Sequence, residues 1–520
     1  MSVTETPVAE VETDGLTATR AKRGKSWIEH WEPENEEFWE STGKHVAKRN
    51  LIFSIFAEHL GFSIWVLWSV VVLNLSNAGF GGGTPFAPSE LFWLTALPNL
   101  VGSALRIPYT FAVPKFGGRV WTAISAALLL IPTTALAAMV HFDFVRGLSH
   151  DSQFTVMLIV AALAGVGGGN FSSSMANISF FYPEKRKGLA LGLNAAGGNL
   201  GVAVVQLLTP LVVIVGVPFA IAKNPVHPVH LAYAGVMWMP FIIAAVVCAW
   251  FLMDSLTMAK ADTKSYATCL KQSQTWVMSI LYIGTFGSFI GFSFALPLVI
   301  KLTFPEFLAQ NPFIGTYLAG LGFLGALIGS FTRPFGGWLS DRIGGAKVTL
   351  WVFIAMAGFT MLAMYGVNQR SFPIFFSSYM VIFALSGAGN GSTYRMIPVI
   401  FGALGRKEAA EKGGDTEATL LSFKRQAAAV IGIAGAIGAF GGFLIQQIFR
   451  LASVPVSAAV TSAKTVDAKA AAAAANADWS TSALGIFIGA YVVFAVMTWF
   501  FYLRKTTESA RVPSLAYAGV

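Results

Sequence analysis

The stretch ALAGVGGG at residues 162–169 returns as ALSGAGNG at residues 384–391. Three glycines, the first alanine and the leucine align at an offset of 222 residues. Arg106 and Arg333 repeat at a similar offset of 227 residues, each within an apolar stretch. Features that recur at nearly the same spacing predict two similar halves, an arrangement typical of secondary transporters with a substrate site between the halves.

These repeats belong to a chain of 520 residues that is 55% hydrophobic and only 12% charged, with a mean hydropathy of +0.63. Soluble domains carry roughly 25% charged residues, so the composition excludes a soluble globular enzyme. A helix crosses the hydrocarbon core of a bilayer with roughly 20 apolar residues. We predict an all-α integral membrane protein with twelve transmembrane helices, over residues 51–75, 89–112, 120–141, 154–181, 188–216, 231–253, 276–300, 314–338, 346–366, 373–400, 426–449 and 482–503.

The basic residues predict the orientation of these helices. With both termini cytoplasmic, 25 of the 35 Lys and Arg residues fall on the cytoplasmic side and seven on the outside. Cytoplasmic loops carry such an excess in membrane proteins. The first 50 residues lack the apolar core of a signal peptide. We therefore predict a multi-pass protein of the inner (cytoplasmic) membrane with both termini in the cytoplasm.

The longest connection within the helical body divides the predicted spans into six plus six. The predicted parts are a cytoplasmic tail over 1–50, an N-terminal six-helix half over 51–253, a cytoplasmic linker over 254–275, a C-terminal six-helix half over 276–503 with an external insert over 451–481, and a cytoplasmic tail over 504–520.

Four charged residues lie well inside the predicted spans, away from their ends: Arg106, Arg333, Arg395 and Glu58. A charge at the bilayer centre costs at least about 2.5–3.5 kcal/mol on insertion scales. One carboxylate cannot neutralise both Arg106 and Arg333, so the empty site is cationic. A guanidinium keeps its charge and presents a planar fork of donors, which suits a small planar oxyanion. The alternative is that the arginines extend to the cytoplasmic face or bind backbone carbonyls.

The sequence GGWLSDRIGG at residues 336–345 resembles the signature loop of the major facilitator superfamily. The matching segment PKFGGR at residues 114–119 lacks the acid. The resemblance implies the major facilitator fold. We expect Asp341 and Arg342 to stabilise one conformation rather than to contact substrate. An ordinary polar turn is the alternative for a single copy of the loop.

Within that superfamily, the chain resembles the nitrate/nitrite porter family. The segment GGGNFSSSMANISFFYPEKRKGLALGLNAAGGNLG at residues 167–201 is similar to the nitrate signature, and GAGNGST at residues 387–393 is similar to a second signature. LYIGTFGSFIGFS at residues 281–293 is also similar. The resemblance covers essentially the whole membrane body. It implies secondary active transport of nitrate and nitrite by alternating access.

The family's site has two arginines that face a nitrate between aromatic rings. The resemblance places these arginines at Arg106 and Arg333. The other positions that it implies are the aromatic residues Phe171, Tyr282 and Phe286 and the amide Asn199. Further candidate residues are Asn170, Asn390, Ser392 and Arg395. For the two phenylalanines, packing in the core is the alternative.

Glu58 distinguishes this sequence from members of the family that exchange anions. Desolvation favours the protonated form of a carboxyl group in hydrocarbon, so Glu58 can carry a proton. Nitrate–proton symport is therefore slightly favoured over obligate nitrate/nitrite antiport or transport of another small organic anion. A structural Glu58 paired with a neighbouring cation is the alternative. Arg395 is a candidate partner of Glu58 or a relay for the anion on the cytoplasmic side.

The remaining residues indicate neither an enzyme nor a receptor. The seven His show no metal-site spacing, and nucleophile and phosphate-loop motifs are absent from the sequence. We expect no cofactor, no metal and no nucleic acid. The expected partners are nitrate, nitrite, protons and the lipid bilayer, and we expect a monomer.

Overall fold

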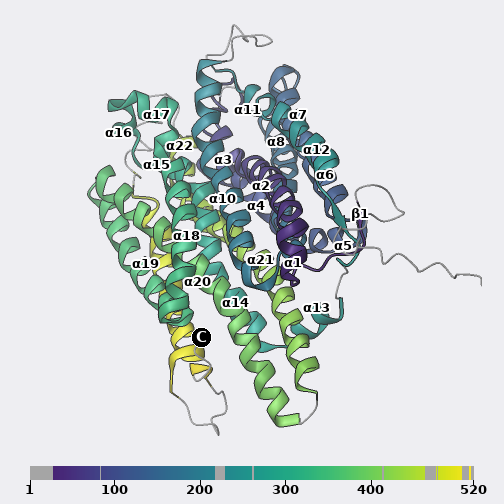
Figure 1. Cartoon of the computed structure of the whole chain (residues 1–520). Helices are drawn as coiled ribbons and strands as arrows, with labels where there is room; N and C mark the ends of the chain where they lie inside the picture. The colour runs from purple at the N-terminus through teal and green to yellow at the C-terminus, as the bar shows by residue number, and fades with distance from the viewer. Residues whose placement is uncertain are drawn as a thin grey trace, which may run out of the picture.

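The computed structural model describes residues 27–81, 84–216, 229–259, 263–412, 415–462, 476, 478–505, 514–516 and 520. The described chain is a bundle of long helices, as the all-α prediction requires. Figure 1 shows most N-terminal helices, coloured purple to blue, on one side and most C-terminal helices, green to yellow, on the other.

The helices of the first half follow one another closely along the chain. They are α1 (Glu36–Phe38), a π-helical turn (Trp39–Gly43), α2 (Lys44–Val66), α3 (Trp68–Val71), α4 (Pro88–Thr110), α5 (Ala112–Phe116), α6 (Gly118–Leu128), α7 (Leu130–His141), α8 (His150–Leu163), α9 (Val166–Phe181), α10 (Glu184–Val215), α11 (Tyr233–Val236) and α12 (Met239–Leu252). The first long helical stretch runs from Glu36 to Val71, so it begins before residue 50, the predicted end of the tail.

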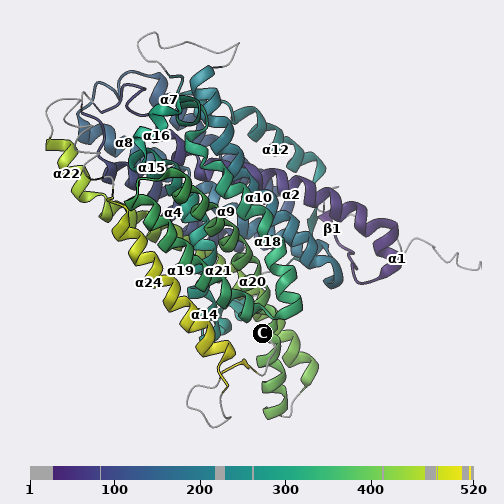
Figure 2. The ribbon, with the colours of Figure 1, turned by 90° about the vertical axis from the view of Figure 1, so that its left-hand side faces the viewer.

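The second half follows the short helix α13 (Thr263–Cys269). Its elements are α14 (Ser273–Tyr282), a π-helical segment (Ile283–Gly287), α15 (Ser288–Thr303), α16 (Pro305–Gln310), α17 (Pro312–Tyr317), a 3-10 turn (Ala319–Leu321), α18 (Phe323–Ile343), α19 (Gly345–Asn368), α20 (Phe372–Lys412), α21 (Thr416–Ala452), α22 (Val454–Ser462), α24 (Thr481–Thr498) and a π-helical end (Trp499–Leu503). Figure 2 shows α24 along the edge of the bundle, where it packs on α19.

Ten helical stretches in the described residues are long and apolar enough to cross a membrane. They coincide with ten of the twelve predicted spans. The other two predicted spans are α4 and α18, of 23 and 21 residues, which are long enough but more polar, and each contains a buried arginine and at least one internal proline. The count of twelve stays a prediction. Most of the predicted insert, residues 463–475 and 477, lies outside the described residues.

The backbone supports the repeat that the sequence predicts. Gly117 and Gly344 precede α6 and α19, with φ angles of 84° and 93°. They lie 227 residues apart, the same offset that separates the two buried arginines. Both have the left-handed conformation that glycine adopts at little cost. At Gly117 a Cβ would also lie 2.5 Å from the Ser255 hydroxyl, so no larger residue fits there.

One end of the bundle carries a docked N-terminal segment. Strand β1 (Trp27–Ile28) pairs in parallel with strand β2 (Ser255–Leu256). The aromatic rings that follow β1 are buried against the end of α9, where Trp31 lies 5.5 Å from Phe181. We call this the inner end, which the distribution of basic residues predicts to be cytoplasmic, and we call the opposite end the outer end.

An ion pair joins the inner end of α2 to the start of the linker. The Arg49 guanidinium lies 2.5 Å from a carboxylate oxygen of Asp254, and Asn50 donates to the same oxygen at 3.2 Å. The Asp254 side chain is only 6% exposed. Its charge therefore depends on these two donors, because a buried carboxylate that loses its partners pays a desolvation cost.

We expect Arg49→Ala to lower the stability of the purified protein by about 1–3 kcal/mol, since it leaves Asp254 with one donor. The measurement is thermal unfolding in detergent. Lys48→Ala is the matched control, because Lys48 is the neighbouring exposed cation. Equal melting temperatures for the two variants would contradict the role of the ion pair.

Candidate functional site

Arg106 lies on α4 at the contact between the two halves and is fully buried. Its Nε donates to the Gly168 carbonyl of α9 at 3.1 Å. Its Nη1 donates to the Gly435 carbonyl of α21, in the other half, at 2.9 Å. Its Nη2 has no hydrogen-bond partner among the described residues. Arg106 is therefore fixed by carbonyls on two sides and retains one free donor group.

Arg333 occupies the equivalent position on α18 and is 6% exposed. Its Nη2 lies 3.5 Å from the Tyr282 hydroxyl, at the limit of a hydrogen bond. Within the described part of the chain its Nη1 has no partner. Arg333 is therefore held more loosely than Arg106, although the two arginines are equivalent in the repeat.

Aromatic rings separate and surround the two guanidinium groups. The Phe171 ring centre lies 4.7 Å from the Arg106 guanidinium carbon and 5.8 Å from that of Arg333. Phe286 lies 4.9 Å from Arg106 and is nearly parallel to Phe171, with ring centres 6.2 Å apart. Tyr282 stacks on Phe286 at 5.5 Å. The structure thus brings together both arginines and the three aromatic residues that the sequence indicated.

Two further aromatic residues contact the arginines, and neither was predicted from the sequence. The Trp65 ring centre lies 5.3 Å from the Arg106 guanidinium carbon, and that of Tyr394 lies 5.7 Å from Arg333. Tyr394 follows Asn390 by four residues, so both lie on one face of α20. That spacing is a signal from which Tyr394 could have been found. Trp65 carries no comparable signal, because it lies in an almost wholly apolar stretch.

The two arginines with Phe171, Tyr282 and Phe286 form a central layer, and three further candidate residues are buried asparagines on different helices. Asn170, Asn199 and Asn390, on α9, α10 and α20, are at most 3% exposed. Neither polar atom of any of the three side chains has a hydrogen-bond partner in the described ranges. Buried polar groups are normally paired. Three unpaired amides together with two free guanidinium groups favour a site for a small polar ligand.

Glu58 on α2 is buried beside this layer, with 1% of its surface exposed. One carboxylate oxygen accepts hydrogen bonds from the Ser174 hydroxyl and, at 2.6 Å, from the Asn194 amide. The other oxygen has no partner among the described residues. No cation of the described chain lies within ion-pair distance of Glu58, although both buried arginines act on it electrostatically. The alternative of a structural Glu58–cation pair is therefore not supported.

Arg395 does not belong to this layer, so its predicted pairing with Glu58 is wrong. Its Nε donates to Asp341 of α18 at 2.5 Å, and both side chains are about half exposed. The physical reason is its position on α20, more than one turn beyond Asn390 toward the inner end. Arg342 lies with its guanidinium 4.2 Å from the Trp338 ring instead of joining Asp341.

Ser392 also lies apart from the arginines, against the neighbouring helix. Its hydroxyl is 2.7 Å from the Thr349 hydroxyl of α19. It also donates to the Gly389 carbonyl at 3.0 Å. The structure thus gives Ser392 a helix-packing contact, and it does not bring this residue to the candidate site.

Contacts between the halves close both ends of the site. Toward the outer end, Thr95 donates to Gln446 at 2.8 Å and the Gln206 amide donates to the Ser293 carbonyl at 2.6 Å. At the inner end, Lys424 of α21 lies 3.2 Å from Glu184 of α10. The inner contact joins two half-exposed side chains, but both arginines are themselves buried, so in this form they lie in an occluded layer between the outer and the inner contacts.

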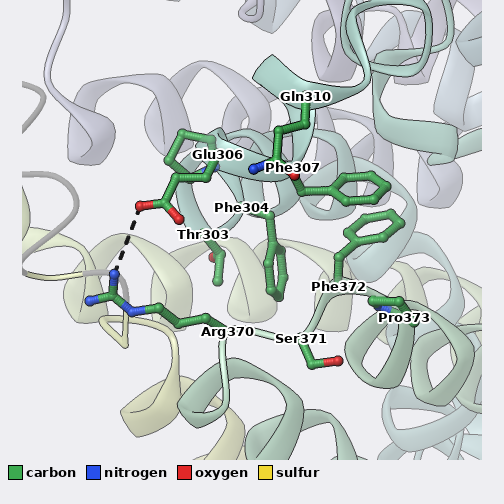
Figure 3. Close-up of a pocket in the computed structure, with 10 residues that line it drawn as sticks. Thr303, Phe304, Glu306, Phe307, Gln310, Arg370, Ser371, Phe372 and Pro373 are labelled. Atoms are coloured by element: carbon green, nitrogen blue, oxygen red, sulfur yellow. Dashed lines mark ion pairs between the residues drawn. The ribbon is translucent and has the colours of Figure 1, made fainter.

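A separate cavity of about 320 Å³ opens at the outer end (Figure 3). Its lining includes the stacked rings of Phe307 and Phe372, 3.9 Å apart, and an exposed Arg370–Glu306 ion pair of 4.0 Å. None of the predicted site residues lines it. It is therefore not the site that the sequence indicated.

The family model described as Major Facilitator Superfamily matches residues 50–445. The Nitrate/nitrite transporter NarU of Escherichia coli (strain K12) is 37% identical over 492 residues, which cover 93% of this chain and 98% of that protein. The Probable nitrate/nitrite antiporter NarK2 of Thermus thermophilus is 34% identical over 437 residues, which cover 81% and 89%.

Solved structures of more distant proteins share the fold. A bacterial homologue of the human lysosomal transporter Spinster, in an inward-facing unoccupied conformation, gives a TM-score of 0.58 at 13% identity, covering 88% of this chain and 97% of that one. A D-xylose-proton symporter gives 0.57 at 14% identity, covering 86% and 97%. The chain therefore belongs to the major facilitator superfamily of membrane transporters and, within it, to the nitrate/nitrite porter family.

Proposed function

We propose that the protein is a secondary transporter that moves nitrate and nitrite across the cytoplasmic membrane, with both termini in the cytoplasm. The observation that carries the proposal is the pair of buried arginines, one from each half, that flank Phe171 and retain unpartnered Nη groups. The names of the relatives agree with these substrates. Both arginines come from one chain, so a monomer contains the whole site.

The chemistry of the layer fits a planar monovalent oxyanion. Guanidinium groups bind the edge of such an ion through parallel N–H donors, and such charge-assisted hydrogen bonds are roughly twice as strong as those between neutral groups. The rings of Phe171 and Phe286 bound the layer on its apolar faces. The amide groups of Asn170, Asn199 and Asn390 add donors that have no partner within the described residues.

The different anchoring of the two arginines assigns them different roles. Arg106 is held by the Gly168 carbonyl of α9, within its own half, and in the occluded form also by the Gly435 carbonyl of α21, so part of its anchoring is present before the anion arrives. Within the described residues the Arg333 side chain makes one long hydrogen bond, with Tyr282, beside its ring contacts with Phe171 and Tyr394, so it is freer than Arg106 to move onto the anion. An anion that bridges the two offsets their mutual repulsion. Binding therefore stabilises the occluded form, because a ligand shifts an equilibrium only through differential contacts.

Alternating access then requires the two sets of closing contacts to break in turn. Outward opening separates Thr95 from Gln446 and Gln206 from Ser293, whereas inward opening separates Glu184 from Lys424. We propose that the halves at 51–253 and 276–503 move as rigid bodies around the arginine layer, joined by the linker at 254–275. Asp341 and Arg395 join α18 to α20 within one half, so their contact stabilises that half as a unit.

Glu58 favours coupling to protons. With Glu58 ionised, the empty layer carries one net positive charge from two arginines and one carboxylate. When nitrate and a proton on Glu58 enter together, the net charge is again one positive. Symport of one nitrate with one proton therefore keeps the buried charge constant. Either ion alone changes it, at a cost that a low-dielectric interior makes large.

Two alternatives make different predictions. An obligate nitrate/nitrite antiporter keeps Glu58 ionised and never returns empty, a mode that agrees with the name of the Thermus thermophilus relative. A carrier for another small organic anion would also use two arginines. Competition of nitrate uptake by small carboxylates distinguishes that carrier from a nitrate transporter.

The experiment is uptake of labelled nitrate into proteoliposomes that contain the purified protein. We expect uptake driven by an inward pH gradient alone, without internal nitrite, and unaffected by a membrane potential set with potassium and valinomycin. Uptake that requires internal nitrite and does not respond to the pH gradient would show that the protein is an antiporter and not a symporter. Absence of nitrate and nitrite transport in both assays would overturn the proposed function.

A further inference from the structure

Trp65 occupies a space that two other helices leave open for it. The residue is fully buried near the end of α2. A Cβ at Gly102 of α4 would lie 2.4 Å from the indole nitrogen, and a Cβ at Gly168 of α9 would lie 2.7 Å from the ring. The indole N–H donates to the Pro98 carbonyl at 2.7 Å. The ring therefore has one fixed orientation between α4 and α9.

This fixed ring contacts the anion-binding layer on one side. Its centre lies 5.3 Å from the guanidinium carbon of Arg106, one helical turn beyond Gly102 on α4. Gly168, against which the ring packs, also supplies the carbonyl that accepts from Arg106 Nε. The same two helices thus position both the indole and the guanidinium group, and a smaller side chain at residue 65 would leave Arg106 room to turn.

On its other side the ring contacts the opposite half. Phe294 of α15 packs edge-to-face on Trp65, with centres 5.8 Å apart and an interplanar angle of 75°. Phe294 neighbours Ser293, whose carbonyl receives the Gln206 hydrogen bond of the outer closure. Trp65 thus contacts Arg106 on one side and, on the other, the residue next to Ser293 of the outer closure.

We propose that Trp65 is the positioning residue for Arg106. We also propose that the contact of Trp65 with Phe294 links closure of the outer end to the orientation of the Arg106 guanidinium group. This inference rests on the proposed anion site. When the halves separate at the outer end, Gly435 leaves Arg106 and Phe294 leaves Trp65, whereas Trp65 and Gly168 stay with Arg106. In the outward-open form Trp65 therefore sets the orientation in which Arg106 receives the anion, and Phe294 adds its contact only on closure.

The two contacts predict a division between KM and kcat. Trp65→Leu removes the ring face and the N–H group, and we expect it to raise the KM for nitrate about tenfold, which lies between the values of an exposed and a desolvated cation–π contact. Trp65→Phe keeps a ring, and we expect a KM within about threefold of the wild type. Phe294→Leu acts on closure, so we expect it to lower kcat with little change in KM.

The matched control is Trp238→Leu, because Trp238 is also buried but lies at the junction of α11 and α12. Nitrate uptake is measured in proteoliposomes with equal amounts of folded protein. A purely structural role would lower kcat alike in the Trp65 and Trp238 variants. A KM in Trp65→Leu within twofold of the control would overturn the inference, as would a Trp65→Phe variant no better than Trp65→Leu. Failure of the proposed function is distinguishable, since the wild type itself would then not transport nitrate.

Discussion

Replacement of Arg333 by Lys is expected to lower nitrate transport at least about 100-fold, since it removes two charge-assisted hydrogen bonds worth about 1.5–3 kcal/mol each. An ammonium group keeps the charge but has no planar fork, so it cannot bind the anion edge-on. Arg106→Lys is expected to lower nitrate transport by as much, because it also removes the hydrogen bond from Nε to the Gly168 carbonyl. The measurement is the initial rate of labelled nitrate uptake in proteoliposomes.

Arg342→Lys provides the control on the same helix as Arg333. Arg342 is exposed at the end of α18 and lies over the Trp338 ring, outside the arginine layer. We expect this variant to retain most of the transport rate. If Arg106→Lys and Arg333→Lys also retain it, positive charge alone is sufficient and bidentate recognition of the anion is excluded.

Glu58→Gln is expected to abolish uptake driven by a pH gradient and to leave exchange of nitrate for nitrite intact. Glutamine keeps the volume and can still accept hydrogen bonds from Ser174 and Asn194. It cannot ionise, however, so the empty site keeps two uncompensated positive charges. The empty carrier therefore returns slowly to the form that faces outward. An anion restores the balance in every exchange cycle. The variant thus turns a symporter into an exchanger, which two uptake assays on the same proteoliposomes measure separately.

Glu40→Gln is the control for Glu58→Gln, because Glu40 lies on the same helical rod at its exposed inner end. We expect it to leave both assays unchanged. Retention of pH-driven uptake in Glu58→Gln would remove Glu58 from the proton pathway. Loss of exchange together with uptake would instead assign Glu58 a role in forming the site itself.

The helices and the two arginines could be predicted because both depend on the cost of polarity in a membrane. Apolar stretches of about 20 residues indicate the spans. A guanidinium group within such a stretch is energetically costly, which indicates a functional role. The repeat then paired Arg106 with Arg333. The family resemblance supplied Phe171, Tyr282 and Phe286, and the structure places all three beside the arginines.

The site features that could not be predicted, or were predicted wrongly, depend on contacts between helices that are distant in sequence. Arg395 looks buried when only its own helix is considered, but Asp341 on α18 provides an exposed partner for it. Trp65 looks like ordinary core, and only Gly102 and Gly168 on two other helices give its ring one position. The unequal anchoring of Arg106 and Arg333 depends on Gly435, which no local pattern connects to α4.

The pairing of β1 with β2 shortens the tether between the two halves. Ala259, just beyond β2, is buried in the same aromatic cluster as Trp31, so the chain is attached to the first half up to that residue. On the other side, α13 (Thr263–Cys269) packs on α21 of the second half, and its Tyr266 ring also lies 4.9 Å from that of Phe111 in the first half. Only residues 260–262 join the two attachments, and a chain extends at most about 3.5 Å per residue. Wide opening of the inner end therefore requires α13 to leave α21, or the chain up to Ala259 to leave the first half, before the helices can separate far.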